Sequence, residues 1–261
     1  MKMLGFFFRH YDPLVERYVF YDDGSTDGTL DVLREHPRVE IRRFERYDVD
    51  SFVLSSRHLN DRVWKESRGR ADWVIISAVD EHLCHRDLPG YLDSARRVGI
   101  AAIPGLGYEM VSADFPDPAE ELTRTRTRGA PEPMWNKLNL FDPDAVEDTN
   151  YGVGRHSAEP TGRIRYPETD ELLILHYKYI GFDYVQRRHA LLSTGLGATD
   201  RKHMWGFQFD FADIELSDKI ADLEHRAVDI AGLAEPGQNH PTARWWRPDS
   251  ASAPGRADGV S

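Results

Sequence analysis

The chain has 261 residues, 40% of them hydrophobic and 30% charged, which is enough for one large α/β domain with its own core. Its net charge of −11 argues against nucleic acid as a general partner. The single cysteine excludes an intramolecular disulfide, and no stretch approaches the roughly 20 apolar residues of a membrane span. We therefore expect no integral membrane segment. Residues 1–8 are too short for a signal peptide, so we expect a cytoplasmic location.

The first two apolar runs predict buried strands over Leu4–Phe8 and Tyr18–Tyr21. The second run ends in the sequence DDGSTDGT, residues 22–29, after which a helical pattern begins. Asp27 or Thr29 is placed to cap that helix. Two aspartates at the carboxyl end of a strand lie where open α/β sheets bind ligands. The ordinary alternative is a capped turn, because turns use the same residue types.

The most apolar strand is predicted over residues 73–77, and it continues into Ala78, Asp80 and Glu81. An unbroken apolar run that ends in a carboxylate is typical of a central parallel strand with a ligand at its end. Asp80 is the right donor for a hard divalent ion, which takes oxygen ligands. The alternative for Asp80 is a helix N-cap.

A helix is predicted over residues 88–98, and a long polar loop over residues 105–133, which contains Glu109. Residues 135–141 alternate like a strand that carries Lys137. Asp148 and His156 follow in a polar stretch rich in glycine.

A third informative run covers residues 171–179, where a buried strand ends in His176 and Lys178. Helices are predicted over residues 182–192 and 214–230. The composition beyond residue 235 turns to Pro, Gly, Ala, Ser and Asp, which predicts a partly disordered tail.

The DDGSTDGT segment resembles the nucleotide-binding loop of family 2 glycosyltransferases with the GT-A fold. The segment AVDEH around Asp80 is similar to the family's Asp-x-Asp metal motif, with Ala78 at the first aspartate position, and LHYKY around His176 is similar to a bacterial branch of the family. The resemblance implies an α/β fold with a Rossmann-like, mostly parallel central sheet flanked by helices. It implies a single domain over residues 1–235 and a tail over residues 236–261.

The resemblance also implies roles for individual residues. Asp80 and His176 become the ligands of Mn²⁺ or Mg²⁺, and the imidazole favours Mn²⁺. The implied donor-binding residues are Asp22, Asp23, Arg9, Asp27, Lys137 and Lys178. The candidates for the catalytic base are His156, Glu109 and Asp148, with His156 preferred because its glycine-rich setting lets it reach an acceptor.

The function implied is that of a hexosyltransferase. Such an enzyme moves a sugar from a nucleoside-diphosphate sugar, with UDP as the first nucleotide to consider, to the hydroxyl of an unknown acceptor. The reaction is expected to be metal-dependent and inverting. Two alternatives stay open: a relative that binds a nucleotide sugar or glycan without turnover, favoured by Ala78, and a nucleotidyltransferase. Nucleotidyltransferases usually have a glycine-rich loop near the first strand. This sequence lacks such a loop, which counts against the second alternative.

Overall fold

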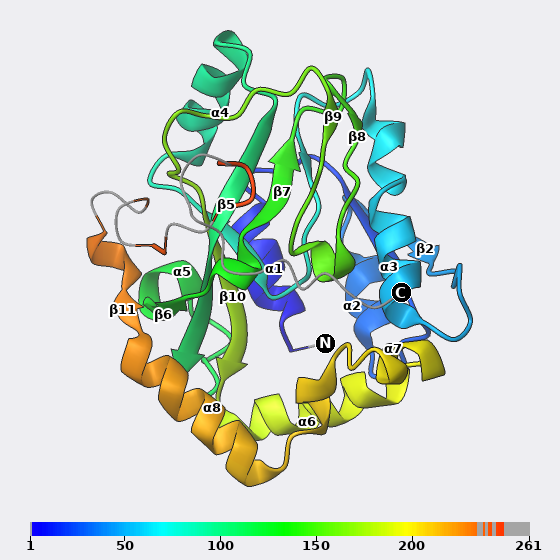
Figure 1. The fold of residues 1–261 in the computed structure, drawn as a ribbon, viewed down its shortest axis with the longest axis vertical. Helices are drawn as coiled ribbons and strands as arrows, with labels where there is room; N and C mark the ends of the chain where they lie inside the picture. Colours follow the sequence, from blue (N-terminus) through cyan, green and yellow to red (C-terminus); the bar gives the residue numbers. More distant parts are fainter. Residues whose placement is uncertain (1, 234–236, 238–239, 242–243, 248–261) are drawn as a thin grey trace.

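The computed structural model describes residues 2–233, 237, 240–241 and 244–247 (Figure 1). The helices are α1 Leu4–Tyr11, α2 Thr29–Glu35, α3 Phe52–Asn60, α4 Leu88–Arg97, α5 Leu122–Thr125, α6 Phe182–Gly195, α7 Ala198–Lys202 and α8 Asp213–Arg226. The strands are β1 Tyr18–Asp22, β2 Val39–Arg43, β3 Val74–Ile75, β4 Glu81–Cys84, β5 Ala102–Ser112, β6 Arg128–Pro131, β7 Lys137–Phe141, β8 Val146–Asp148, β9 Thr161–Gly162, β10 Leu173–Ile180 and β11 Val228–Asp229. Within the described part of the chain, no helix has the length and apolar character needed to cross a membrane.

The central sheet is mixed and has seven strands. Its order is β11-β6-β5-β10-β4, and β7 pairs with both β5 and β3. Strand β10 runs parallel to β5 and antiparallel to β4, while β6 and β7 are antiparallel to β5. The chain is therefore an α/β domain, as expected, but the described central sheet is mixed rather than mostly parallel. The parallel pair β1-β2 forms a separate sheet, and so does the antiparallel pair β8-β9.

The core lies on both faces of the central sheet. Alternate residues of a strand face opposite sides. Leu175 and Tyr177 of β10 therefore join an apolar cluster with Phe6 of α1, and the opposite face of β10 carries His176 and Lys178. In Figure 1, β5 and β10 point toward α6 and α8, which cross beneath the ends of these two strands. The polar face of β10 thus leads from the middle of the sheet to α6.

The strand expected over Leu4–Phe8 is wrong, because these residues form the first part of α1. Leu4, Phe7 and Phe8 pack into one apolar cluster, while Phe6 packs into another. A short helix that is buried on most of its surface has an unbroken apolar sequence, so its pattern resembles that of a buried strand. The helix α1 packs against β4, where Tyr11 donates a hydrogen bond to the carbonyl of Glu81 at 2.9 Å.

Two other expectations about strands need correction. The run over residues 73–77 contains only the two-residue strand β3, which is antiparallel to β7 rather than central and parallel. The long loop expected over residues 105–133 begins as the buried second half of β5 and ends in β6. The glycines inside β5 are the reason why the sequence predicts a loop here instead of a strand. A Cβ atom at Gly105 would lie 2.5 Å from the Ile174 side chain, and one at Gly107 would lie 2.4 Å from Trp135, so the glycines permit close packing.

A buried carboxylate joins α7 to the start of α3. Asp200 of α7 accepts hydrogen bonds from the backbone amides of Phe52 at 2.8 Å, Val53 at 3.3 Å and Gly197 at 3.0 Å, and from the hydroxyl of Ser51. Amides in the first turn of a helix have no partner within the helix, so this carboxylate caps α3 from outside. Segments far apart in the sequence are thereby held together.

We expect Asp200→Ala to lower the free energy of unfolding by about 2 kcal/mol, the upper range for the loss of a helix cap. Burial alone would raise the pKa of Asp200, but the Ser51 hydroxyl and the backbone amides outweigh it and lower the pKa. The carboxylate therefore stabilises the fold above the pKa that Asp200 has when unfolded. This contribution is lost as the pH falls below that value. Urea unfolding at pH 7 and pH 3 checks both statements: the variant and the wild type should differ less at pH 3.

Part of the segment expected as a tail packs against the domain. His240 lies 2.9 Å, by its Nε2 atom, from the carbonyl oxygen of Gly107. The indole of the buried Trp246 donates to Asp170 at 2.9 Å, and Arg244 pairs with the same carboxylate. The end expected to be disordered, from about residue 251, lies outside the described residues.

Candidate functional site

Three ionisable side chains form a row across the centre of the sheet. In the register, His176 of β10 lies between Glu81 of β4 and Glu109 of β5. All three side chains are buried. Residues directly opposite each other on neighbouring strands are close in space. The carboxylate of Glu109 lies 3.1 Å from Nδ1 of His176, whereas that of Glu81 pairs with Lys137 and Arg155. Neither glutamate is close to the other or to His176 in the sequence.

Asp80 lies in the turn that leads into β4, with only 2% of its surface exposed. Its Oδ2 atom is 2.9 Å from Nη2 of Arg188 on α6 and 3.3 Å from Nε2 of His176. Its Oδ1 atom is buried and has no hydrogen-bond partner among the described residues. Burial alone would raise the pKa of Asp80, but Arg188 and His176 outweigh it and hold the pKa below its ordinary value. Asp80 is therefore an anion with one oxygen free to bind a ligand.

The His176 ring is held between two acids. Its Nδ1 atom lies 3.1 Å from Glu109 and its Nε2 atom faces Asp80. Burial alone would lower the pKa of His176, but Glu109 and Asp80 outweigh it and raise the pKa to about 9. Nδ1 of His176 and Oε2 of Glu109 form an ion-pair contact, and neither atom has a hydrogen-bond partner among the described residues. The His176 ring thus has a carboxylate beside each of its nitrogens.

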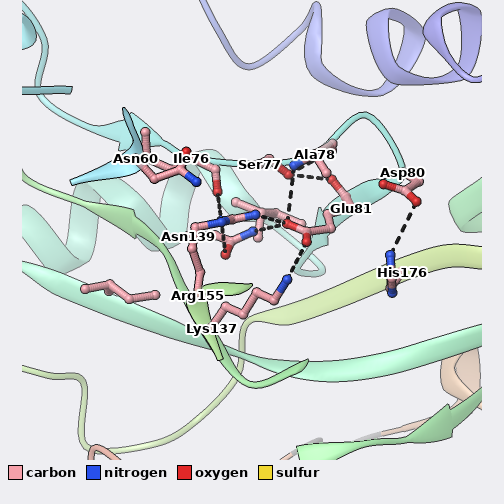
Figure 2. A network of polar contacts seen from close by, with 12 residues as sticks. Asn60, Ile76, Ser77, Ala78, Asp80, Glu81, Lys137, Asn139, Arg155 and His176 are labelled. Atoms are coloured by element: carbon pink, nitrogen blue, oxygen red, sulfur yellow. Dashed lines mark hydrogen bonds and ion pairs between the residues drawn. The ribbon is translucent and has the colours of Figure 1, made fainter. Parts of the chain in front are cut away.

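The carboxylate of Glu81 is enclosed by donors (Figure 2). It accepts hydrogen bonds from Nζ of Lys137 at 2.7 Å, Nδ2 of Asn139 at 3.0 Å and Nη2 of Arg155 at 2.8 Å. The amide of Ala78 adds a further bond at 3.3 Å, which closes the turn around Asp80. Burial would raise the pKa of Glu81, but Arg155 and Lys137 hold it well below its ordinary value. Glu81 thus fixes the turn that presents Asp80.

The backbone at Arg155 is strained to serve this network. Its φ of 60° lies in the left-handed region, which residues other than glycine rarely adopt. The guanidinium also donates to the carbonyl of Ile76 at 2.6 Å and to Oδ1 of Asn139 at 3.1 Å. Burial of Lys137 beside these groups lowers the pKa of its ammonium to about 8, despite the attraction of Glu81. Lys137 is therefore paired with Glu81, and its expected role in donor binding stays a prediction.

Lys178 lies on β10 at an irregularity of the sheet. Between His176 and Tyr179, β10 advances three residues while β5 advances two, which is a β-bulge. Bulges re-aim side chains and are common beside active sites. The Lys178 ammonium lies over the rings of Tyr179, Phe209 and Trp135, at 5.2, 5.3 and 6.0 Å from their centroids. Burial lowers its pKa. No hydrogen bond or ion pair from Lys178 to another described residue is seen, so it remains a cation available to an anionic ligand.

Trp135 connects His156 to the centre of the site. Its ring centroid lies 4.2 Å from that of His176 and 4.8 Å from that of His156. Nδ1 of His156 is 2.7 Å from the carbonyl oxygen of Met134. Burial and the nearby Lys137 lower the pKa of His156 to about 4, so the imidazole is neutral at pH 7. His156 is thus placed beside the site as a neutral acceptor of protons.

The aspartates of the DDGSTDGT loop have different surroundings. Asp22 accepts from the amides of Gly24 at 3.0 Å and Ser25 at 3.2 Å, so it shapes the loop itself. Asp27 accepts from Thr29 in the same way, and the residue at the N-cap of α2 is Gly28 rather than either predicted cap. Asp23 points outward, 2.8 Å from Nη2 of Arg46.

Helix α6 links Asp23 to Asp80. Arg46, which pairs with Asp23, also donates to the carbonyl of Gly195 at the end of α6, at 3.1 Å. Arg188, two turns earlier on the same helix, holds Asp80. The structure therefore connects both aspartates to α6, Asp23 through Arg46 and Asp80 through Arg188.

Two predicted site residues lie apart from this cluster. The guanidinium of Arg9 binds the carbonyls of Pro118 and Glu120 at 2.7 and 2.9 Å, and thereby ties α1 to the segment before α5. Asp148 of β8 is an exposed residue that pairs with Lys65. Neither is brought to Asp80 or His176 by any described contact.

The described residues contain no group of three or more His, Cys, Asp and Glu side chains arranged to hold a metal ion. Asp80 and His176 nevertheless fit a smaller site. Their facing atoms are 3.3 Å apart, close to the roughly 3 Å between adjacent ligands that each lie about 2.1 Å from one ion. Mg²⁺ and Mn²⁺ are often held by one or two protein ligands, with phosphate oxygens and water completing the shell. The oxygen that faces His176 is Oδ2, which also pairs with Arg188, while Oδ1 has no hydrogen-bond partner among the described residues and is the oxygen open to a further ligand.

Sequence reasoning missed Arg188 and Arg155 entirely. Arg188 occupies an ordinary position on an amphipathic helix, and nothing in its neighbours announces a buried partner. Arg155 follows Gly154 in a polar stretch rich in glycine, and only the tertiary structure brings it to Glu81 of β4 and Asn139 of β7. Glu81 could be found from the sequence, because it directly follows Asp80 after the apolar run over residues 73–77.

No known protein-family model matches the sequence, and no curated protein matches it significantly. The function therefore has to be argued from the geometry of the site.

Proposed function

We propose that this chain is a metal-dependent glycosyltransferase that uses a nucleoside-diphosphate sugar, with UDP as the first nucleotide to test. The observation that carries the proposal is the buried pair of Asp80 and His176. An acid with a free oxygen faces an imidazole at 3.3 Å, and cationic side chains surround them. A divalent ion on a diphosphate needs this combination of ligands and positive charge.

In this proposal, different residues bind the nucleoside, the metal ion and the diphosphate of the donor. Asp23, at the far end of α6, holds the nucleoside. Asp80 and His176 hold Mn²⁺ or Mg²⁺, which when bound neutralises the diphosphate and assists its departure. Lys178 has no carboxylate partner, so it adds positive charge beside the diphosphate. Glu81, Lys137 and Arg155 do not touch the donor but keep the turn at Asp80 rigid.

Deprotonation of the acceptor hydroxyl is assigned to His156. The ring is neutral at pH 7, and its centroid lies 4.8 Å from that of Trp135, which also contacts His176. Glu109 is occupied with His176, and Asp148 lies at the surface with Lys65. In-line attack at the anomeric carbon by the activated hydroxyl inverts its configuration.

A thermal-shift panel of UDP, GDP, dTDP and CDP, each with and without Mn²⁺, tests the proposal. We expect one nucleotide to raise the melting temperature only when Mn²⁺ is present. A ligand at a hundredfold excess over its dissociation constant stabilises the native state by about 2.7 kcal/mol. His176→Ala should abolish the shift, because one of the two metal ligands is gone.

Asp148→Asn is the matched control, since the structure places this aspartate with Lys65 at the surface. It should keep the full shift. If no nucleotide stabilises the wild type under any condition, the glycosyltransferase proposal is wrong. If the shift persists in His176→Ala, the nucleotide binds elsewhere.

A binding protein without turnover is the second candidate, and Ala78 favours it. The family pattern has an aspartate at this position, whereas the Ala78 amide only closes the turn on Glu81. Metal-dependent hydrolysis of the donor separates the two candidates, because a binding protein would show the thermal shift without release of sugar.

A further inference from the structure

We propose that Arg188 is an exchangeable counter-ion of Asp80, which occupies the carboxylate until a divalent ion and a diphosphate displace it together. The inference rests on the proposed function in one respect, the assignment of Asp80 as a metal ligand. It adds a form of regulation: the metal binds weakly unless the donor accompanies it.

The first support is the uneven use of the Asp80 carboxylate. Both Arg188 and His176 approach the same oxygen, Oδ2, while Oδ1 has no hydrogen-bond partner among the described residues. A structural ion pair of arginine and carboxylate is usually bidentate, with each oxygen receiving one N–H group. Arg188 instead uses a single nitrogen on Asp80, so the contact is one that can be exchanged.

The second support is the attachment of Arg188 to α6 rather than to the sheet. Its other terminal nitrogen donates to the hydroxyl of Tyr184, one turn earlier on the same helix, at 2.8 Å. The Arg188 side chain is 22% exposed, whereas that of Asp80 is 3% exposed. The guanidinium can therefore leave Asp80 while it keeps Tyr184 and gains solvent or another anion. The carboxylate stays where Glu81 and the turn have fixed it.

The third support is the balance of charge. A divalent ion carries twice the charge of a guanidinium, but it must displace Arg188 from a buried acid and leave that cation near Lys178. Without a donor this exchange crowds positive charge into the site. A diphosphate supplies the anionic oxygens that the released Arg188 can bind, as arginine commonly does. Metal and diphosphate therefore bind cooperatively.

Titration of the intact protein with Mn²⁺, followed by the electron paramagnetic resonance of the free ion, tests the inference without any nucleotide. Arg188→Met should bind Mn²⁺ at least tenfold more tightly than the wild type, since nothing competes for Asp80. Arg187→Met is the matched control, because Arg187 is an exposed neighbour on the same helix. It should bind Mn²⁺ like the wild type.

A second variant covers the case in which Arg188→Met does not fold. Arg188→Gln removes the positive charge that competes for Asp80 and keeps an amide that can donate to the Tyr184 hydroxyl. It should raise the affinity for Mn²⁺ in the same direction by a smaller factor. Unchanged or weaker Mn²⁺ binding in the folded variants overturns the inference.

A second titration, with UDP present, separates this inference from the proposed function. UDP should raise the Mn²⁺ affinity of the wild type by more than that of Arg188→Met. If Arg188→Met gains affinity for Mn²⁺ but UDP, GDP, dTDP and CDP change nothing in any variant, Arg188 is a counter-ion and the glycosyltransferase proposal fails. If nucleotides bind with Mn²⁺ but Arg188→Met shows no gain, the counter-ion inference fails and the glycosyltransferase proposal stands.

Discussion

Glu81→Ala is expected to destabilise the folded protein by about 3–5 kcal/mol, the range for breaking a buried ion pair by removing one partner. The side chain of Glu81 is 3% exposed and pairs with Lys137 and Arg155, whose side chains are 3% and 8% exposed. Both cations would stay buried without a counter-charge, and Asn139 would lose its acceptor. Urea unfolding, followed by circular dichroism at pH 7, measures the change.

An exposed glutamate provides the control for this prediction. Glu121 pairs with Arg124 at the surface, where ion pairs contribute about 0–1 kcal/mol, so Glu121→Ala should have little effect. The pair of substitutions Glu81→Leu and Lys137→Met should cost less than Glu81→Ala alone, because one buried cation is removed together with its acid. A loss below about 1 kcal/mol for Glu81→Ala would show that water reaches this network.

Asp80→Asn is expected to reduce metal-dependent hydrolysis of UDP-sugars by about a thousandfold, which corresponds to about 4 kcal/mol of transition-state stabilisation. The amide is nearly the same size but is a poor ligand for a hard divalent ion. In the metal-free protein it also leaves Arg188 and His176 without their shared acid. Turnover at saturating Mn²⁺ with a panel of UDP-sugars measures the loss, and it requires no knowledge of the acceptor.

The fold of the variant must be checked separately, because Asp80 is buried. Its far-ultraviolet circular dichroism should match that of the wild type, and Asp148→Asn should retain full turnover. If Asp80→Asn keeps more than a tenth of the wild-type rate, Asp80 is not a metal ligand, and the site needs another assignment.

The spacing of apolar residues predicted those helices and strands whose formation depends mainly on the local sequence. The helices α4, α6 and α8 lie where the 3.6-residue period placed them, and β7 and β10 lie where apolar alternation or burial indicated strands. The expectation that Asp80 and His176 lie together is confirmed by their 3.3 Å contact. Each residue ends an apolar run, and that position is visible in the sequence.

The predictions that were wrong concern structure that depends on contacts between distant segments of the chain. The helix α1 is buried on several sides, so its sequence lacks the periodicity that separates helices from strands. The second half of β5 looks like a loop because Gly107 accommodates Trp135, a neighbour that only the tertiary structure supplies. Arg188 is missing from the sequence prediction for the same reason: its partner, Asp80, lies on another element.

The position of β10 between β4 and β5 also has a consequence for how the chain folds. Both neighbours precede β10 by a long stretch of sequence, and β10 pairs with β4 from Leu173 to His176 and with β5 from Leu173 to Ile180. Chains dominated by such distant pairings fold slowly, because the entropy of closing a long loop is lost before the stabilising contacts form. During synthesis, the edge of β4 and the edge of β5 that pair with β10 remain unpaired until the chain has been extended to Ile180. The pair of Asp80 and His176 therefore forms in the same kinetic phase that closes the sheet, and a chain that is trapped before this step lacks the site as well as its central strand.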